Sequence, residues 1–231
     1  MRTGRAVLAA SALAFLWNGP LVARSAAPVD WSRTVVKTPA GGFQMGNPKA
    51  RVKLVEYGSL ACPHCRDFNQ IGVPPLVQHY VRPGRVSYEF RSFLLNGPDV
   101  SVSLLAHCAG PAKFFPMSRA VFDSQPEWLG KIAALTEAQR AEFEQMDDQQ
   151  RLARIGEIAG FPQIAARFGV TAARARQCLT DSKATERLVG ITRAAADAGI
   201  AGTPTFLING EVTGAATWEQ LEPLLKKAAG R

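Results

Sequence analysis

The chain has 231 residues, of which 47% are hydrophobic and 20% charged, a composition typical of a globular protein and not of a disordered or fibrous one. Its formal net charge at pH 7 is +8, but no basic stripe is interleaved with aromatic residues, so nucleic-acid binding is not expected. The four cysteines include only one Cys-x-x-Cys pair, which excludes a zinc site built from two such pairs, and we expect no metal.

The first 25 residues have the pattern of a secretory signal peptide. Arg2 and Arg5 give a positively charged start, and a short apolar run from Ala6 to Trp17 follows. Small residues then occur at cleavage spacing in Ala23-Arg24-Ser25, although an arginine beside the cut is unusual. The apolar run is short for a membrane span. We therefore expect cleavage and export to the periplasm, with an uncleaved membrane anchor as the alternative.

A strand is predicted over residues 51–57, because alternate side chains there suit opposite faces of a sheet. Glu56 shares one face with Val52 and Leu54, so a core-facing position for these two would bring the Glu56 carboxyl into apolar surroundings. Burial disfavours a charged carboxylate, and the pKa of Glu56 should then rise toward neutral pH. The alternative is that Glu56 lies in water at the end of the strand with an ordinary pKa.

The stretch Cys62-Pro63-His64-Cys65 follows that strand. Two cysteines three apart lie on one face of a helix, within reach of a disulfide. Pro63 suits the first turn of a helix, so Cys62 would cap it, and free backbone N–H groups would stabilise a Cys62 thiolate. His64, if protonated, would add positive charge. We expect Cys62 to attack and the less accessible Cys65 to resolve the mixed disulfide; a structural disulfide and a chance spacing are the alternatives.

The segment after the cysteine pair completes a strand–helix–strand unit. A helix should run to about residue 81 and must kink or restart at Pro74-Pro75. Residues 85–95 predict a strand, because apolar and polar side chains alternate along them. A connection of this length favours a parallel pair of strands. Asn96-Gly97-Pro98 marks the first domain boundary.

Residues 99–181 show helical periods and no convincing strand, which predicts a helical insertion. It contains Cys108 and Cys178, and two leftover cysteines in an exported protein are expected to pair. The alternative is two separate buried thiols. Neither cysteine belongs to a Cys-x-x-Cys motif, so neither is expected to be catalytic. His79 and His107 are expected on solvated helix surfaces.

The C-terminal part returns to the sheet. Residues 182–198 predict a helix, and a strand, a tight turn at Asn209-Gly210 and a final helix follow. Thr203-Pro204 stands at the head of the strand, where a proline has no N–H to pair. If their bond is cis, the Thr203 backbone could bind an extended substrate segment as an added strand. A trans bond would make this an ordinary strand start.

Three features taken together resemble the DsbA-like branch of the thioredoxin superfamily. They are the Cys-Pro-His-Cys motif, the glutamate six positions before it, and Gly-Thr-Pro-Thr-Phe-Leu-Ile-Asn-Gly at 202–210. The resemblance implies an α/β thioredoxin fold with an inserted all-helical domain. With the boundaries above, the chain divides into a signal peptide (1–25), a first thioredoxin part (26–98), the helical insertion (99–181) and a second thioredoxin part (182–231).

The resemblance also implies roles for single residues. Cys62 would be the nucleophile, Cys65 its buried partner, and Glu56 a buried acid able to relay the Cys65 proton. His64 would stabilise the thiolate, and Pro204 would be a cis-proline facing the cysteines. No cofactor is implied.

The activity implied is thiol–disulfide exchange that introduces disulfides into reduced, unfolded secreted proteins, with a membrane quinone-linked thiol oxidase as the reoxidant. Two positions depart from the family pattern. Thr203 stands where the best-known oxidases carry valine and related isomerases carry threonine, and Asn69 stands where some relatives carry a second acid. One alternative is therefore a disulfide isomerase or reductase kept reduced by a partner. Another, from a different class, is a non-catalytic secreted thioredoxin-like binding module.

Overall fold

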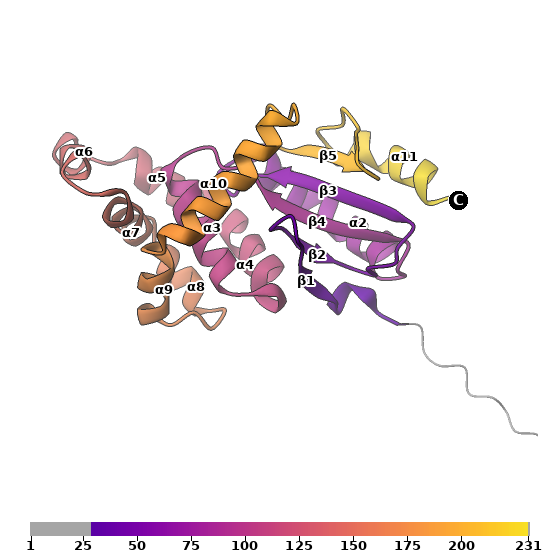
Figure 1. Ribbon diagram of the computed structural model, residues 1–231, viewed down its shortest axis with the longest axis horizontal. Coiled ribbons are helices and arrows are strands. Elements are labelled where there is room, and N and C mark those ends of the chain that lie inside the picture. The colour runs from indigo at the N-terminus through magenta and orange to yellow at the C-terminus, as the bar shows by residue number, and fades with distance from the viewer. Residues whose placement is uncertain (1–28, 231) are drawn as a thin grey trace, which may run out of the picture.

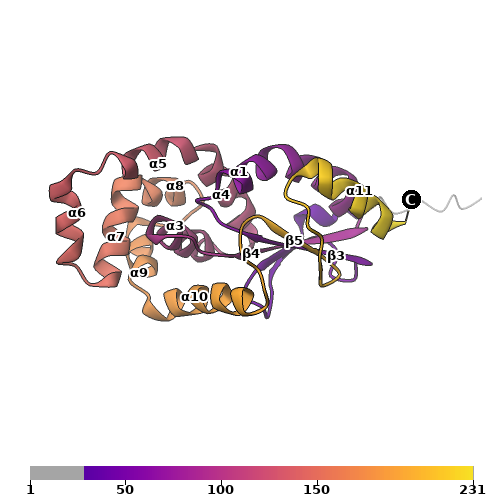
Figure 2. The ribbon, with the colours of Figure 1, turned by 90° about the horizontal axis from the view of Figure 1, so that it is seen from above.

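The computed structural model describes residues 29–230 (Figure 1). The expected signal peptide lies outside the described residues. Within them the chain forms one mixed sheet with helices on both faces and a group of helices at one end. Figure 2 shows helices α1 (Pro63–Asp67) and α11 (Trp218–Ala229) on one side of the sheet and α10 (Ser182–Asp197) on the other.

The sheet has six strands among the described residues, in the spatial order β1-β2-β4-β3-β5-β6. Its centre is the predicted parallel pair, β3 (Val52–Gly58) and β4 (Val86–Ser92). The other strands pair antiparallel around this centre: β1 (Val35–Lys37), β2 (Phe43–Met45), β5 (Thr205–Ile208) and β6 (Glu211–Val212). The predicted turn between β5 and β6 is confirmed, because Asn209 and Gly210 both have positive φ, as a two-residue hairpin requires.

The connection from β3 to β4 is helical but not uniformly α-helical. It runs through α1, η2 (Phe68–Gly72), α2 (Val73–Leu76) and η3 (Val77–Val81), and both η segments are π-helical turns. Pro74-Pro75 lies between them, where missing N–H groups and ring bulk disturb the α-helical ladder. The predicted disturbance at the prolines is therefore present, as wider turns on both sides of them. This connection and α11 cover the sheet face that carries Glu56.

Seven helices lie between β4 and the helix α10, and together they form the group at the end of the sheet. They are α3 (Gly97–Cys108), α4 (Pro111–Asp123), α5 (Gln125–Ala133), α6 (Glu137–Glu144), α7 (Asp148–Ala159), α8 (Phe161–Ala166) and α9 (Ala172–Leu179). Apolar side chains of all of these helices except α6 share one core cluster with the two cysteines of the Cys-x-x-Cys motif. The α/β fold with an inserted all-helical segment is thus confirmed, whereas the exact domain boundaries stay a prediction.

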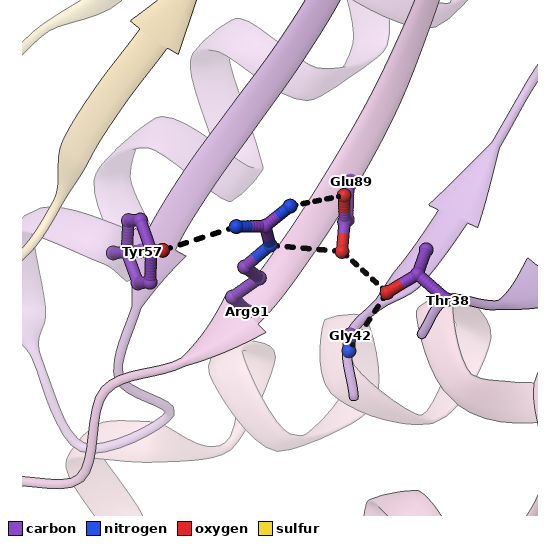
Figure 3. Close-up of polar contacts among 5 residues, drawn as sticks. All are labelled: Thr38, Gly42, Tyr57, Glu89 and Arg91. Atoms are coloured by element: carbon purple, nitrogen blue, oxygen red, sulfur yellow. Dashed lines mark hydrogen bonds and ion pairs between the residues drawn. The ribbon is translucent and has the colours of Figure 1, made fainter. Parts of the chain in front are cut away.

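A polar network occupies the sheet face opposite Glu56 (Figure 3). The Arg91 guanidinium donates to both carboxylate oxygens of Glu89 at 2.9 Å and to the Tyr57 hydroxyl at 3.1 Å. The Thr38 hydroxyl donates to Glu89 at 2.6 Å and accepts from the Gly42 N–H at 3.1 Å. The network therefore ties the β1–β2 turn to the two central strands.

The expectation of a solvated His107 is wrong. Its ring packs against Phe43 and Phe114, and its Nε2 lies 3.2 Å from the Ser92 hydroxyl oxygen. Burial, helped by the nearby positive charge of Lys37, lowers the pKa of His107 to about 3, so the ring is neutral. His79 is exposed, as expected.

Candidate active site

The Cys-Pro-His-Cys stretch lies where β3 ends and α1 begins. Cys62 takes the N-cap position with an extended backbone (φ −83°, ψ 124°), and Pro63 is the first helical residue. Both cysteines are free thiols in this structure. Cys65, one turn into the helix, is completely buried, whereas Cys62 keeps 5% of its surface exposed. The helix start predicted from Pro63 therefore gives the two thiols different surroundings.

These surroundings lower the pKa of the Cys62 thiol to about 5. The largest cause is a hydrogen bond from the Cys65 thiol, and burial works against it. A hydrogen bond from the Thr203 side chain and the backbone N–H groups of Cys65 and His64 lower the pKa further. The Cys62 sulfur also lies 3.3 Å from the Thr203 carbonyl oxygen, a contact that favours the thiol, but the donors to the thiolate prevail.

Cys65 is shifted in the opposite direction. Burial, the hydrogen bond that it gives to Cys62, and the nearby Glu56 carboxylate all raise the pKa of the Cys65 thiol well above its usual value. The Ser59 N–H, 3.5 Å from the Cys65 sulfur, only partly opposes this rise. At neutral pH the pair therefore holds one proton, on Cys65, and one negative charge, on Cys62.

Glu56 lies inside the protein, near both cysteines of the pair. Its side chain is 2% exposed and accepts a hydrogen bond from the Tyr88 hydroxyl. Burial raises the pKa of Glu56 to about 8, with a smaller contribution from the Cys62 thiolate. The buried interpretation of Glu56 is thus the one present in the structure. Gly58 makes room for it, since a Cβ at this position would lie 2.8 Å from the Glu56 Oε1 atom.

The other residues singled out in the sequence lie in three different surroundings. The Thr203–Pro204 peptide bond is cis, and Pro204 is buried next to the cysteine pair through the Thr203 contact. His64 and Pro63 are exposed, and the His64 ring makes no hydrogen bond to any residue in the range 29–230. Away from this site, Cys108 and Cys178 form a disulfide between α3 and α9, with Cα atoms 6.2 Å apart.

Sequence reasoning missed three buried polar residues at this site. Tyr88 faces Glu56 because Leu54 pairs with Tyr88 across the parallel strands, and this register could have been inferred from the two alternating patterns. Asp99 and Gln125 contact the loop that leads into the motif, from the insertion. No spacing in the sequence relates these two to the loop.

Residues 29–230 contain no group of histidine, cysteine and acidic side chains arranged to hold a metal. None of the helices in the same range is long and apolar enough to cross a membrane.

Comparisons with known proteins agree with this geometry. The family described as Thioredoxin matches residues 38–227. A crystal structure of a protein-disulfide isomerase from Novosphingobium aromaticivorans is 30% identical with a TM-score of 0.76, and the match covers 81% of this chain and 97% of that one. The crystal structure of Wolbachia pipientis alpha-DsbA1 is 25% identical with a TM-score of 0.61, over 84% and 92% of the two chains.

Among curated sequences, the "Putative protein-disulfide oxidoreductase" of Rickettsia felis is 28% identical over 186 residues. That match covers 80% of this chain but 59% of the Rickettsia protein. The chain thus spans less than two thirds of the length of the curated relatives that it matches most strongly.

Proposed function

This chain belongs to the thioredoxin family, in its DsbA-like branch with a helical insertion, and we propose that it is a protein thiol:disulfide oxidoreductase that donates disulfides to exported proteins. The observation that carries the proposal is the opposite shift of two neighbouring thiols, with the pKa of Cys62 lowered to about 5 and that of Cys65 raised. A thiolate that is stable when free is a good leaving group, which favours passing a disulfide on to a substrate.

In the proposed reaction the oxidised protein holds a Cys62–Cys65 disulfide. A substrate thiolate attacks the Cys62 sulfur, forms a mixed disulfide and releases the Cys65 sulfur, which takes up a proton. Glu56, protonated at neutral pH because its pKa is about 8, supplies that proton and then takes up another from the solvent.

The second step releases the product. Another substrate thiolate attacks the substrate sulfur of the mixed disulfide, forms the substrate disulfide and expels Cys62 as its stabilised thiolate. The substrate loses two electrons, the cysteine pair gains them, and the two substrate protons have already gone to solvent. Reoxidation then requires an external acceptor, for which we propose a membrane quinone-linked thiol oxidase.

The setting of this chemistry is also part of the proposal. Substrates would be reduced, unfolded proteins in the periplasm, which the chain would reach through the N-terminal signal peptide expected at residues 1–25. Thr203 would bind the substrate segment through its backbone, next to Pro204. An oxidising compartment is where the Cys108–Cys178 disulfide would also persist.

A second function, disulfide isomerisation or reduction, has two observations in its favour. The Thr203 side chain contributes to the lowered pKa of the Cys62 thiol, and the neighbour from Novosphingobium aromaticivorans is described as an isomerase. Isomerisation would use the same Cys62 thiolate, but on a protein kept reduced by a partner.

Stoichiometric oxidation of a reduced, unfolded protein that contains two cysteines tests the proposed activity. The oxidised wild type should form about one substrate disulfide per molecule within the assay. Cys65→Ser holds no disulfide to pass on, so it should form no substrate disulfide, and it should trap a mixed disulfide at Cys62 only when the substrate is supplied in its oxidised form. Cys62→Ser should do neither. Full activity of Cys62→Ser would contradict the proposal, and no exchange by the wild type would favour a binding module.

A further inference from the structure

We propose that Gln125 is a positioning residue for the cysteine pair, and that Asp99 fixes the other side of the same loop. Both belong to the helical insertion, and both contact the four-residue loop Ser59–Cys62 that joins β3 to α1. Through them the insertion would set how strongly the protein stabilises the Cys62 thiolate. The inference rests on the proposed function and deepens it.

Gln125 reaches the loop from the first position of α5. It is completely buried, and its Nε2 group donates to the Leu60 carbonyl oxygen at 2.9 Å and to the Cys62 carbonyl oxygen at 3.1 Å. Both N–H bonds of the amide are thus used on this loop. The two carbonyls flank Ala61, so one side chain holds the backbone of the loop on both sides of this residue.

The carbonyl oxygen of the Gln125 amide shows that a glutamine at this position is not optimal for stability. The Gln125 Oε1 atom is buried and has no hydrogen-bond partner among the described residues. A buried acceptor without a partner costs free energy that an apolar side chain of similar size would not cost. The presence of an amide at this position is therefore better explained by its hydrogen bonds to the loop than by packing.

Asp99 holds the loop from the first turn of α3. Its Oδ1 atom accepts the Leu60 N–H at 3.0 Å, and its Oδ2 atom accepts the Ser59 hydroxyl at 2.6 Å. Oδ2 also accepts the Leu95 N–H at 3.0 Å, just after β4. The side chain is completely buried, and no cation within residues 29–230 forms an ion pair with it. Leu60 is thus held by its N–H from Asp99 and by its carbonyl from Gln125.

These contacts matter because the loop leads directly into the first turn of α1. The Cys62 carbonyl that Gln125 holds also accepts the Arg66 N–H at 3.1 Å, in that turn. The direction of the Cys62 carbonyl therefore sets the orientation of the first turn of α1 relative to the Cys62 side chain. The N–H groups of His64 and Cys65, which lower the pKa of Cys62, belong to the same turn. A looser loop would let the sulfur move away from these donors and make the thiolate less stable.

The test is the ultraviolet absorbance titration of the Cys62 thiolate in the folded, reduced full chain, with the Cys108–Cys178 disulfide left intact. Gln125→Met keeps the volume but removes both donors, and it should raise the pKa of Cys62 by about one unit. The thiolate fraction at pH 5 should then fall about fivefold. Gln125→Asn keeps an amide that is too short to reach both carbonyls, so it should shift the pKa in the same direction and serves as the test if Gln125→Met does not fold.

Ser101→Ala is the matched control. It removes another buried bond from a side chain to a carbonyl, from the Ser101 hydroxyl to Leu152 at 3.0 Å, which lies wholly within the insertion. This variant should lose stability but keep the pKa of Cys62. An unchanged pKa in folded Gln125→Met and Gln125→Asn would overturn the inference and leave Gln125 a docking contact. The readout needs no turnover, so it stays separate from failure of the proposed function, which would appear as a wild type without exchange.

Discussion

Glu56 and Cys65 form a proton pair at the bottom of the site, and this pair is the residue-scale basis of the proposed mechanism. Glu56 is neutral below its pKa of about 8 because it is buried, and Cys65 must gain or lose a proton whenever the pair is reduced or oxidised. A buried acid beside a buried thiol avoids placing two negative charges in the same apolar space.

We expect Glu56→Gln to slow the exchange steps in which Cys65 changes protonation, by roughly tenfold or more, since general acid–base assistance is typically worth that much or more. The pH–rate profile of the variant should also lack the ionisation near pH 8. Stopped-flow measurement of substrate oxidation between pH 5 and pH 9 checks both expectations.

Tyr88→Phe is the companion variant. Without its hydroxyl, residue 88 no longer lowers the pKa of Glu56, so the ionisation of Glu56 in the pH–rate profile should move to higher pH. An identical profile in all three proteins would contradict a buried acid.

The same carboxyl makes stability depend on pH. Its pKa is about 8 in the folded protein and about 4.5 when unfolded, so the folded state binds the proton more tightly. The free energy of unfolding contributed by Glu56 should therefore be highest below pH 4.5 and fall as the pH rises toward 8. Urea unfolding of the wild type and of Glu56→Gln at pH 5 and pH 8 measures this. A difference between the two proteins that does not change with pH would exclude the raised pKa.

Residue-scale features were predictable where the pattern is local. The face of Glu56 followed from the two-residue period of a strand, and the helix start at Pro63 followed from its missing N–H. Gln125 and Asp99 could not be found in this way, because they meet the loop through tertiary packing across 65 and 39 residues of chain. The solvated interpretation of His107 was wrong for the same reason, since Phe43 lies on a distant strand.

At the scale of elements, Arg91 and Glu89 hold the β1–β2 turn against the central strands. We expect Arg91→Met to lower the free energy of unfolding by about 3 kcal/mol, because it leaves Glu89 buried without its cation. The double variant Arg91→Met/Glu89→Gln should recover part of that loss, because no buried charge is left over. Urea unfolding of the three proteins gives the comparison. Lys131→Met, which breaks the exposed pair with Glu127, is the control and should cost far less.

The disulfide between α3 and α9 is the second element-scale feature. It closes a loop of 70 residues, and replacing Cys108 and Cys178 by alanine should cost about 4 kcal/mol in the chain-entropy account. Oxidation of a substrate by the folded double variant should remain, since these cysteines lie outside the Cys-x-x-Cys pair. Unfolding curves and the single-turnover assay check the two parts separately. Loss of exchange with an intact fold would show a role beyond stability.

Strands were easier to predict than helices in this chain. The strands predicted at residues 51–57 and 85–95 are present as β3 and β4, because apolar and polar side chains alternate along both segments. The prolines at 74 and 75 predicted a disturbance, but not its form as two π-helical turns. That form depends on how the helix must follow the sheet below it.

At the scale of the whole molecule, the stabilised thiolate links redox state to stability. The pKa of Cys62 is about 5 in the folded reduced protein against an ordinary value of 9.0, so ionisation stabilises the reduced fold. This contribution is complete above pH 9 and is lost as the pH falls through 5. At pH 7 the reduced protein should therefore unfold at a higher urea concentration than the oxidised protein. The difference between their urea midpoints should become smaller at pH 4.5. A more stable oxidised form at pH 7 would argue against a disulfide donor.

The overall architecture was predictable because motif and topology agree. A parallel strand–helix–strand unit with Cys-Pro-His-Cys at its turn, followed by helical periods and a Thr-Pro strand, is consistent with one fold class. The position of the insertion over the loop Ser59–Cys62 was not predictable, because helix packing depends on surfaces that a sequence pattern does not order. The connection between insertion and site is thus visible only in three dimensions.

The equilibrium reduction potential of the Cys62–Cys65 pair, measured in glutathione buffers, decides whether this protein is built to donate disulfides. A disulfide donor with a stabilised Cys62 thiolate should have a potential near the oxidising end of the family range, at roughly −120 mV. A value of roughly −270 mV would contradict the proposed disulfide donor, because the pair would then be built to reduce disulfides.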